Sequence, residues 1–468
     1  MDTADTLTPQ TSQAATRAPL TLPGILWYSL ANLGFGMFYA FNNFVIPLWL
    51  RHYTGNAILL GLMGGSHSFE GVIIQPVVGS ISDRMRGPGG RRRPFMRVFI
   101  LISTLFLLLA PAASYLPPPL RLAAIVTCIF LFTLTFNVAV DPYQALLADI
   151  TTPGQRGKVT GFWFFVGALG QVSILVLPIP TNIKFPVVAV LMLGTTWLTC
   201  LKTHEPVVTT PPETPRGHMD DIKLALAGLK TLRQARIYMV MFLLYGAGVG
   251  VVVPFLTLFI RSIAHAHSPR MTEPQLDSLA QGLSALLLIA TAVGSLAFGW
   301  LADRIGPKRL LLLSLGLVAV AAINGTWITT PLQIALVLGL AGLGIGAQNA
   351  SAYPLLTRIV PAKEIGFYVG LQTAAASISG PGAVALTGAL INHSGYRVIF
   401  AVCAACLGLA FAALSLLRER EAAGEVAART SEITPSPPIL GELETPGPLP
   451  LLLPQNWGPG GDLNERRY

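Results

Sequence analysis

The stretch that decides the fold is Gly79-Ser-Ile-Ser-Asp83-Arg84, which recurs 220 residues later as Gly299-Trp-Leu-Ala-Asp303-Arg304. Each copy follows a long apolar segment and precedes a basic cluster, Arg91-Arg92-Arg93 in the first case and Lys308-Arg309 in the second. The same glycine, aspartate and arginine at the same place after an apolar segment indicate an internal duplication. Parallel repeats of this kind place a substrate cavity between the two halves, near the middle of a membrane.

The composition excludes an ordinary soluble enzyme and a disordered protein. Apolar residues make up 52% of the 468 residues and charged residues only 11%, whereas soluble domains carry about 25% charged residues. The four cysteines lie in apolar segments and do not indicate a disulfide scaffold. Membrane helices need about 20 residues each, so the length suits twelve. We expect them near 24–50, 57–82, 94–115, 121–149, 157–179, 184–202, 237–262, 279–302, 308–328, 331–357, 364–391 and 395–417.

Lysine and arginine are distributed unevenly between the connecting segments. With a cytoplasmic N-terminus, the cytoplasmic segments hold 25 of the 31 basic residues. This bias predicts that both termini are cytoplasmic, in a multi-pass protein of the cell (inner) membrane without a cleavable signal peptide. The net charge of +9 is therefore a topology signal, and no nucleic-acid partner is expected. The outer basic residues are Arg51, Arg121, Lys184, Arg261, Arg270 and Arg397.

Five parts follow from this pattern. We expect an N-terminal cytoplasmic tail (1–23), a six-helix half (24–202), a central cytoplasmic loop (203–236), a second six-helix half (237–417) and a disordered cytoplasmic tail (418–468). Glycine-rich strings at 61–65 and 339–346 are interpreted as faces on which helices pack closely.

The duplicated Gly-x-x-x-Asp-Arg motif with its basic run resembles the major facilitator superfamily, over roughly residues 24–417. Within it, Gln75–Pro94 and Pro142–Asp149 are similar to the sucrose/proton symporters and the related glycoside–pentoside–hexuronide:cation symporters. The resemblance implies an all-α membrane protein, with twelve transmembrane helices as two six-helix repeats, that works as a secondary transporter without cofactors. Sodium-coupled relatives hold the cation with two carboxylates on the second helix. Gly71 and Gln75 stand there in this chain, which favours protons over sodium.

The charges beside the repeated motif are candidates for a conformational latch. A carboxylate at the C-terminal end of a helix needs a cation nearby, because it lies at the negative end of the helix dipole. Ion pairs that form in one conformer alone would bias an alternating-access equilibrium. The alternative is that these charges only fix topology. The latch candidates are Asp83, Arg84, Arg91, Arg92, Arg93, Asp149, Asp303, Arg304 and Arg309, and Asp149 is expected to approach Arg358.

Acidic residues are scarce inside the expected spans, where only Glu70 and Asp141 lie well within one. No lysine or arginine lies at a comparable depth. Desolvation favours the protonated form of a buried carboxyl group, so these acids could take up and release a proton as water enters and leaves. His67 lies three residues before Glu70 on the same helix face and could share its proton, or it could simply serve packing. Two such ligands do not make a metal site, and none is expected.

Amide and aromatic side chains in the spans are candidate contacts for a sugar. Amides both donate and accept hydrogen bonds, and aromatic rings stack on the apolar face of a pyranose. Each one alone is more often a helix–helix hydrogen bond, and the lack of intramembrane cations disfavours anionic substrates. The candidates are Asn32, Tyr39, Asn42, Asn137, Tyr143, Gln171, Gln348, Asn349, Tyr353 and Gln372.

The sequence thus predicts a monomeric, proton-coupled symporter of a neutral sugar or glycoside that works in the lipid bilayer by alternating access. A proton-driven exporter of lipophilic drugs or cations is the first alternative, and a non-transporting membrane scaffold or sensor is the second. An enzyme is not expected, because no nucleophile elbow, phosphate-binding loop, zinc motif or nucleotide fingerprint occurs.

Overall fold

The computed structural model describes residues 19–66, 74, 78, 81–82, 90–152, 155–205, 232–361, 365–419 and 424. Helices dominate these ranges, and no strand occurs in them. Eleven helical segments of this part are long and apolar enough to cross a membrane. The second expected span is described mainly over α3 (Ala57–Gly64). The predicted all-α membrane architecture is confirmed.

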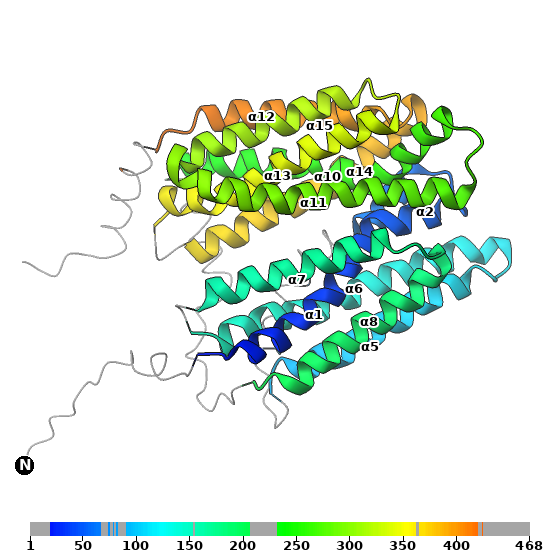
Figure 1. The fold of residues 1–468 in the computed structure, drawn as a ribbon, viewed down its shortest axis with the longest axis horizontal. Helices are drawn as coiled ribbons and strands as arrows, with labels where there is room; N and C mark the ends of the chain where they lie inside the picture. The colour runs from blue at the N-terminus through cyan, green and yellow to red at the C-terminus, as the bar shows by residue number, and fades with distance from the viewer. Residues whose placement is uncertain are drawn as a thin grey trace, which may run out of the picture.

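The helices form two bundles that lie side by side (Figure 1). In the first, α1 packs on α7 and α8, and α5 packs on α6 and α8. In the second, α10 packs on α14 and α15, and α13 packs on α11 and α12. The first bundle contains α1 (Leu22–Ala40), α5 (Arg93–Ala113), α6 (Pro118–Ile150), α7 (Arg156–Val176) and α8 (Thr181–Lys202). The segments that follow α1 in the first half of the chain, η2 (Phe41–Val45), α2 (Ile46–Leu50) and α3, lean against α10 and α14 of the second bundle (Figure 1). The second contains α10 (Arg233–His267), α11 (Glu273–Ile305), α12 (Pro307–Gly325), α13 (Pro331–Ile359), α14 (Ile365–Ser394) and α15 (Val398–Ser415).

Two ends of the molecule are distinguished by the chain itself. Helix α1 begins and α15 ends at one end, which we call the terminal face (Figure 1). The connections 51–56, 177–180, 268–272 and 395–397 lie at the opposite end, which we call the distal face.

The first span is continuous from Leu22 to Leu50 but contains a π turn at 41–45. Pro47 follows this turn and lacks an amide hydrogen, so it cannot complete the regular helical hydrogen bonding. Widened turns of this kind often mark functional positions. Asn42 lies in the turn and donates its amide to the carbonyl oxygen of Gly64 at 2.9 Å, which ties α3 to this point.

Helices α10 and α11 are longer than the expected spans 237–262 and 279–302. Helix α11 starts early because Thr272 and Gln275 form a capping box ahead of the apolar segment. The polar residues Glu273 and Asp277 therefore lie on a helix and not in a loop. This extension carries charges that contact the other bundle.

The glycine-rich string of α13 serves as a packing face, as the sequence predicts. A Cβ atom added to Gly346 would lie 2.5 Å from the amide nitrogen of Ser295 on α11, and one added to Gly344 would lie 2.6 Å from Val318 on α12. Gly339, by contrast, has open space around it. The close approach of α13 to both neighbours therefore depends on Gly342, Gly344 and Gly346.

Candidate functional site

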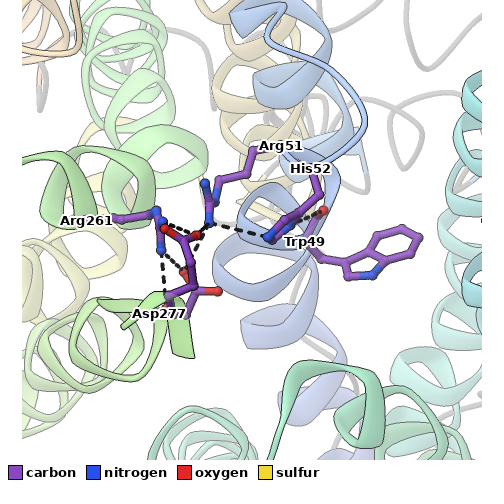
Figure 2. Close-up of polar contacts among 6 residues, drawn as sticks. Trp49, Arg51, His52, Arg261 and Asp277 are labelled. Carbon is purple, nitrogen blue, oxygen red and sulfur yellow. Dashed lines mark hydrogen bonds and ion pairs between the residues drawn. The ribbon is translucent and has the colours of Figure 1, made fainter. Parts of the chain in front are cut away.

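A cluster of four charged residues joins the two bundles at the distal face (Figure 2). Arg51 follows α2 in the first half of the chain, and its Nη2 lies 2.6 Å from Glu273 Oε2 and 3.8 Å from Asp277 Oδ1 on α11. Arg261 of α10 holds the same two acids from within the second bundle, with Nη1 2.6 Å from Asp277 Oδ1 and Nη2 bonded to Glu273. We call these four residues the distal cluster.

Neighbouring residues connect the distal cluster to the surrounding loops. His52 Nδ1 lies 3.0 Å from the carbonyl oxygen of Trp49, and its Nε2 lies 3.4 Å from Arg51 Nη2 (Figure 2). Tyr396, in the loop between α14 and α15, is close enough for its ionisation to respond to Arg51. Burial raises the pKa of the Tyr396 phenol, and the positive charge of Arg51 opposes that rise. The guanidinium of Arg51 thus faces the second bundle on two sides.

A second polar contact crosses between the bundles below the distal cluster. Lys184 Nζ donates to Gln281 Oε1 of α11 at 2.5 Å and to the carbonyl oxygen of Ile174 at 2.7 Å. The sequence analysis placed Lys184 in an outer segment, whereas the structure places it in the first turn of α8 with 2% of its surface exposed. Gln281 follows Asp277 by four residues, so both lie on the same face of α11.

Close backbone packing completes the distal contact. A Cβ atom added to Gly388 of α14 would lie 2.7 Å from the Cα of Ile58 on α3, and one added to Gly61 would collide with Phe255 and Val384. Asn392 accepts a hydrogen bond from the amide of Ala57 at 3.3 Å. The hydrogen bonds and ion pairs that the structure describes between the bundles lie at this end. This conformation is therefore closed at the distal face.

At the terminal face, three predicted latch residues meet within the first bundle. Arg91 Nη2 lies 2.9 Å from Asp149 Oδ1, and Arg92 Nε bonds to the other oxygen of Asp149. Asp149 lies in the last turn of α6, and the two arginines directly precede α5. The contact therefore ties the two helix ends together.

The sequence analysis missed Glu205, which organises the same arginines. The Glu205 carboxylate accepts backbone N–H bonds from Arg91 at 2.9 Å, Arg92 at 3.0 Å and Arg93 at 3.3 Å. It therefore caps the start of α5, where unpaired N–H groups attract negative charge. Gly90 has a φ of +86°, and its surroundings leave no room for a Cβ beside Glu205. The only sequence signal was a glycine before a basic run.

The latch candidates of the second bundle make different contacts. The Arg304 guanidinium stacks 3.6 Å from the ring centre of Trp300, one turn earlier on α11. Arg309 is exposed and forms no ion pair with the described residues. Arg358 pairs with Glu419 at 3.5 Å, so the expected approach to Asp149 is not made in this conformation. Asp303 lies in the last turn of α11.

Four candidates lie outside the described residues: His67, Glu70, Asp83 and Arg84.

Asp141 lies within the membrane-spanning part of α6. The Tyr39 ring of α1 packs edge-on against Phe136 of the same helix α6, with the ring centres 5.6 Å apart. Asn137 precedes Asp141 by one turn of the same helix and is 6% exposed. The structure thus places a carboxyl group and an amide on one face of α6, on the helix whose Phe136 contacts the Tyr39 ring of α1.

Several predicted substrate contacts form helix–helix hydrogen bonds in this conformation. Tyr143 OH donates to the Tyr28 carbonyl oxygen at 2.8 Å, and Tyr28 OH returns a bond to the Tyr143 carbonyl oxygen at 3.1 Å. Asn32 donates to the carbonyl oxygen of Trp163 at 2.7 Å. Gln348 and Gln372 accept from tyrosines of α10, at 3.3 and 3.0 Å. Gln171 is half-buried, whereas Asn349 and Tyr353 are exposed.

Two helical bundles that contact each other at one end, built from helices apolar enough to cross a membrane, form the architecture of a multi-pass membrane protein. The family model described as Major Facilitator Superfamily matches residues 28–280 and 238–457. The chain therefore belongs to the major facilitator superfamily, whose members are transporters and not enzymes.

Curated relatives match parts of the chain. Solute carrier family 45 member 3 of Homo sapiens is 34% identical over 116 residues, which cover 23% of this chain and 21% of the relative. Multidrug resistance protein MdtG of Salmonella arizonae is 28% identical over 194 residues, or 40% of this chain and 45% of the relative. The matched part thus spans between about a fifth and half of these relatives' lengths.

Solved structures superpose on most of the chain. The nucleoside transporter NupG superposes with a TM-score of 0.67 at 13% identity, over 85% of this chain and 99% of that one. A D-xylose-proton symporter superposes with a TM-score of 0.63 at 16% identity, over 85% and 98%. At this identity the likeness concerns the fold, and it confirms the predicted major facilitator fold.

Proposed function

We propose that this transporter is a proton-coupled symporter of a neutral sugar or glycoside. The observation that carries the proposal is the position of Asn137 and Asp141 on one face of α6, the helix whose Phe136 packs against the Tyr39 ring. Asp141 supplies a carboxyl group that can carry a proton within the membrane. The phenol and the amide supply hydrogen bonds of the kind a hydroxyl-rich ligand needs. A solved structure of the same fold is named a D-xylose-proton symporter, so its name gives a sugar and a proton as the transported species, which supports the assignment.

The proposed orientation follows from the basic residues. With the terminal face in the cytoplasm, the distal face is the outer one, and the conformation described is closed to the outside. Proton and substrate would bind with the distal face open and Asp141 accessible. Their binding neutralises the carboxylate, which removes the cost of enclosing a charge. The bundles then close at the distal cluster and release both ligands to the cytoplasm.

The remaining candidates have roles in the same proposal. Glu70 is assigned the role of a second proton carrier, with His67 as the residue that could share its proton. The latch candidates of the two halves meet across the terminal face in the outward-open state, with Arg91, Arg92 and Asp149 acting as a unit that is already assembled within the first bundle. The transporter works as a monomer in the cell membrane.

Export of lipophilic drugs or cations is the second candidate function. It is favoured by curated relatives named as multidrug resistance proteins, namely MdtG and a Lactococcus lactis homolog of the efflux pump PmrA, which is 31% identical over 112 residues covering 24% of this chain and 26% of the relative. An intramembrane acid such as Asp141 suits cationic cargo as well as protons. A non-transporting scaffold or sensor has no such support.

Uptake into proteoliposomes tests the proposal. Neutral sugars and lipophilic cations are offered in separate counterflow assays, and the accepted sugar is then followed under an imposed pH gradient. We expect Asp141→Asn to keep counterflow exchange but to lose accumulation driven by the gradient. Glu419→Gln, an acid outside the spans, is the matched control and keeps both. Full accumulation by Asp141→Asn would refute the assigned role, and exchange of cations alone would favour the exporter.

A further inference from the structure

The Lys184 side chain is enclosed in protein, and none of its described partners is a carboxylate. Its side chain is almost fully buried, and its two hydrogen-bond partners, the Ile174 carbonyl and the Gln281 amide oxygen, are both neutral. Among the described residues, no carboxylate oxygen lies within 4 Å of the ammonium nitrogen. Buried charges are normally paired, because their removal from water is costly.

The number of hydrogen bonds matches an amine better than an ammonium. An ammonium has three N–H donors, and the structure supplies two acceptors. A neutral amine has two N–H donors, which these two acceptors satisfy completely. A third N–H enclosed without a partner would add a further penalty.

The position of Lys184 links this mismatch to movement of the bundles. Ile174 belongs to the same bundle as Lys184, whereas Gln281 belongs to α11 of the other bundle. Parting of the distal face therefore removes Gln281 and admits water to the nitrogen. Closing it encloses the nitrogen again.

The charged groups around Lys184 do not compensate its charge. Helix α11 contributes Glu273 and Asp277, the end of α2 contributes Arg51, and α10 contributes Arg261. These four are paired with one another in the distal cluster.

Phe185, the residue after Lys184, packs among aromatic side chains on the side of α2. Phe185, next to Lys184, packs against Trp49 and Phe41 with ring centres 4.9 Å apart in each case. The titratable Tyr53 lies beyond Trp49. The residue that follows Lys184 along the chain thus packs among rings that carry no charge.

We propose that Lys184 is a proton-binding site of the distal face, an ammonium when that face is open to water and an amine when it is closed. On closing, one N–H bond breaks, its electron pair stays on Nζ, and the proton passes to water leaving the interface. On opening, water returns the proton. This site is distinct from Asp141 and goes beyond the coupling proposed above.

The sign of the pH dependence follows from proton counting. The closed state binds one proton fewer, so a higher pH favours the closed distal face. Where the two states differ by one proton, the ratio of closed to open molecules changes up to about tenfold per pH unit.

Distances between spin labels on the two sides of the distal face test this inference. The labels go on Gly55→Cys and Arg270→Cys, both exposed, in a background with Cys128, Cys200, Cys403 and Cys406 replaced by serine. Double electron–electron resonance then gives the open fraction in nanodiscs at several pH values. We expect this fraction to fall severalfold per pH unit as the pH rises. Lys184→Met should remove that dependence, and Lys184→Arg should keep the distal face more open at every pH.

Two variants separate this site from other titrating groups. Lys202→Met alters an exposed lysine at the opposite end of α8 and should retain the wild-type pH dependence. Asp141→Asn should leave a fall of the open fraction with pH at least as steep as in the wild type, because protonation of Asp141 favours closing in the coupling proposal and so opposes the effect of Lys184. If Lys184→Met does not fold, Lys184→Gln takes its place. A wild-type open fraction that ignores pH, or an unchanged dependence in the Lys184 variants, would overturn the inference.

Discussion

Arg51 and Glu273 lie 222 residues apart in the chain, yet their side chains meet at 2.6 Å across the two bundles. Arg261 holds the same glutamate from its own bundle, so Glu273 keeps a cation when the bundles part. Arg51 has no such second partner among the described acids outside α11. When the bundles part, Arg51 is therefore the member of the cluster that loses its ion-pair partners, and water can hydrate it at the surface.

Arg51→Gln is expected to favour the distal-open conformation. Since Glu273 is 60% exposed, water screens the pair, and the effect should be about 0.2–1 kcal/mol, or up to about a fivefold change in the open-to-closed ratio. The same spin-label distance measures it. In a double-mutant cycle with Glu273→Gln the two effects should be less than additive. Strict additivity would show that the contact does not contribute.

Substitution of Gly388 should prevent the distal face from closing. A Cβ at this position would meet the Ile58 backbone at 2.7 Å, and a backbone atom cannot move aside as a flexible side chain can. Gly388→Leu is expected to give a folded protein that stays open at the distal face and transports at a small fraction of the wild-type rate. Gly370→Ala on the same helix, where the space is open, should behave as wild type. Normal closure in Gly388→Leu would contradict the described contact of α3 with α14.

Glu205→Ala should destabilise the terminal end of the first bundle. The substitution leaves the N–H groups of Arg91, Arg92 and Arg93 without their carboxylate, and the loss of a helix cap costs about 0.5–2 kcal/mol. We expect a lower midpoint of thermal unfolding in detergent. Glu205→Gln retains an acceptor oxygen, so its unfolding midpoint should lie between those of the wild type and Glu205→Ala. Equal unfolding temperatures for all three proteins would rule out the capping role.

Tyr143→Phe separates packing from ligand binding. The Tyr143 hydroxyl is fully buried and bonds to the Tyr28 carbonyl, so its removal should cost about 1 kcal/mol of stability. The apparent affinity for the transported sugar should stay unchanged. A large rise in KM without loss of stability would instead make Tyr143 a substrate contact, as its residue type suggested.

The fold could be predicted because its causes are local in sequence. Each helix could be predicted from features of its own segment, namely a long apolar stretch, a repeated motif or, in α13, a glycine string. Helix ends were less predictable, since Glu273 and Asp277 are polar and look like a loop until the capping box at Thr272 is considered. Apolarity alone therefore shortened α11 by two turns.

The site was harder to predict because its contacts are distant in sequence. Glu205 and Lys184 lie near helix ends, where charged residues are common, and nothing local identifies the partners that bury them. Amides posed the opposite problem. Asn32 and Gln372 have the chemistry of ligand contacts, but the same chemistry joins helices, and only the position of a neighbouring carbonyl or hydroxyl distinguishes the two.

Helix α11 carries Glu273 and Asp277 at one end and Asp303 and Arg304 at the other. Its 33 residues contain no proline beyond the first turn, so it forms a stiff rod of about 50 Å. If this helix tilts about its middle, its two ends move in opposite directions. The opening or closing of one membrane face is thus coupled to the other face through a single rigid helix, without a contribution from the loops.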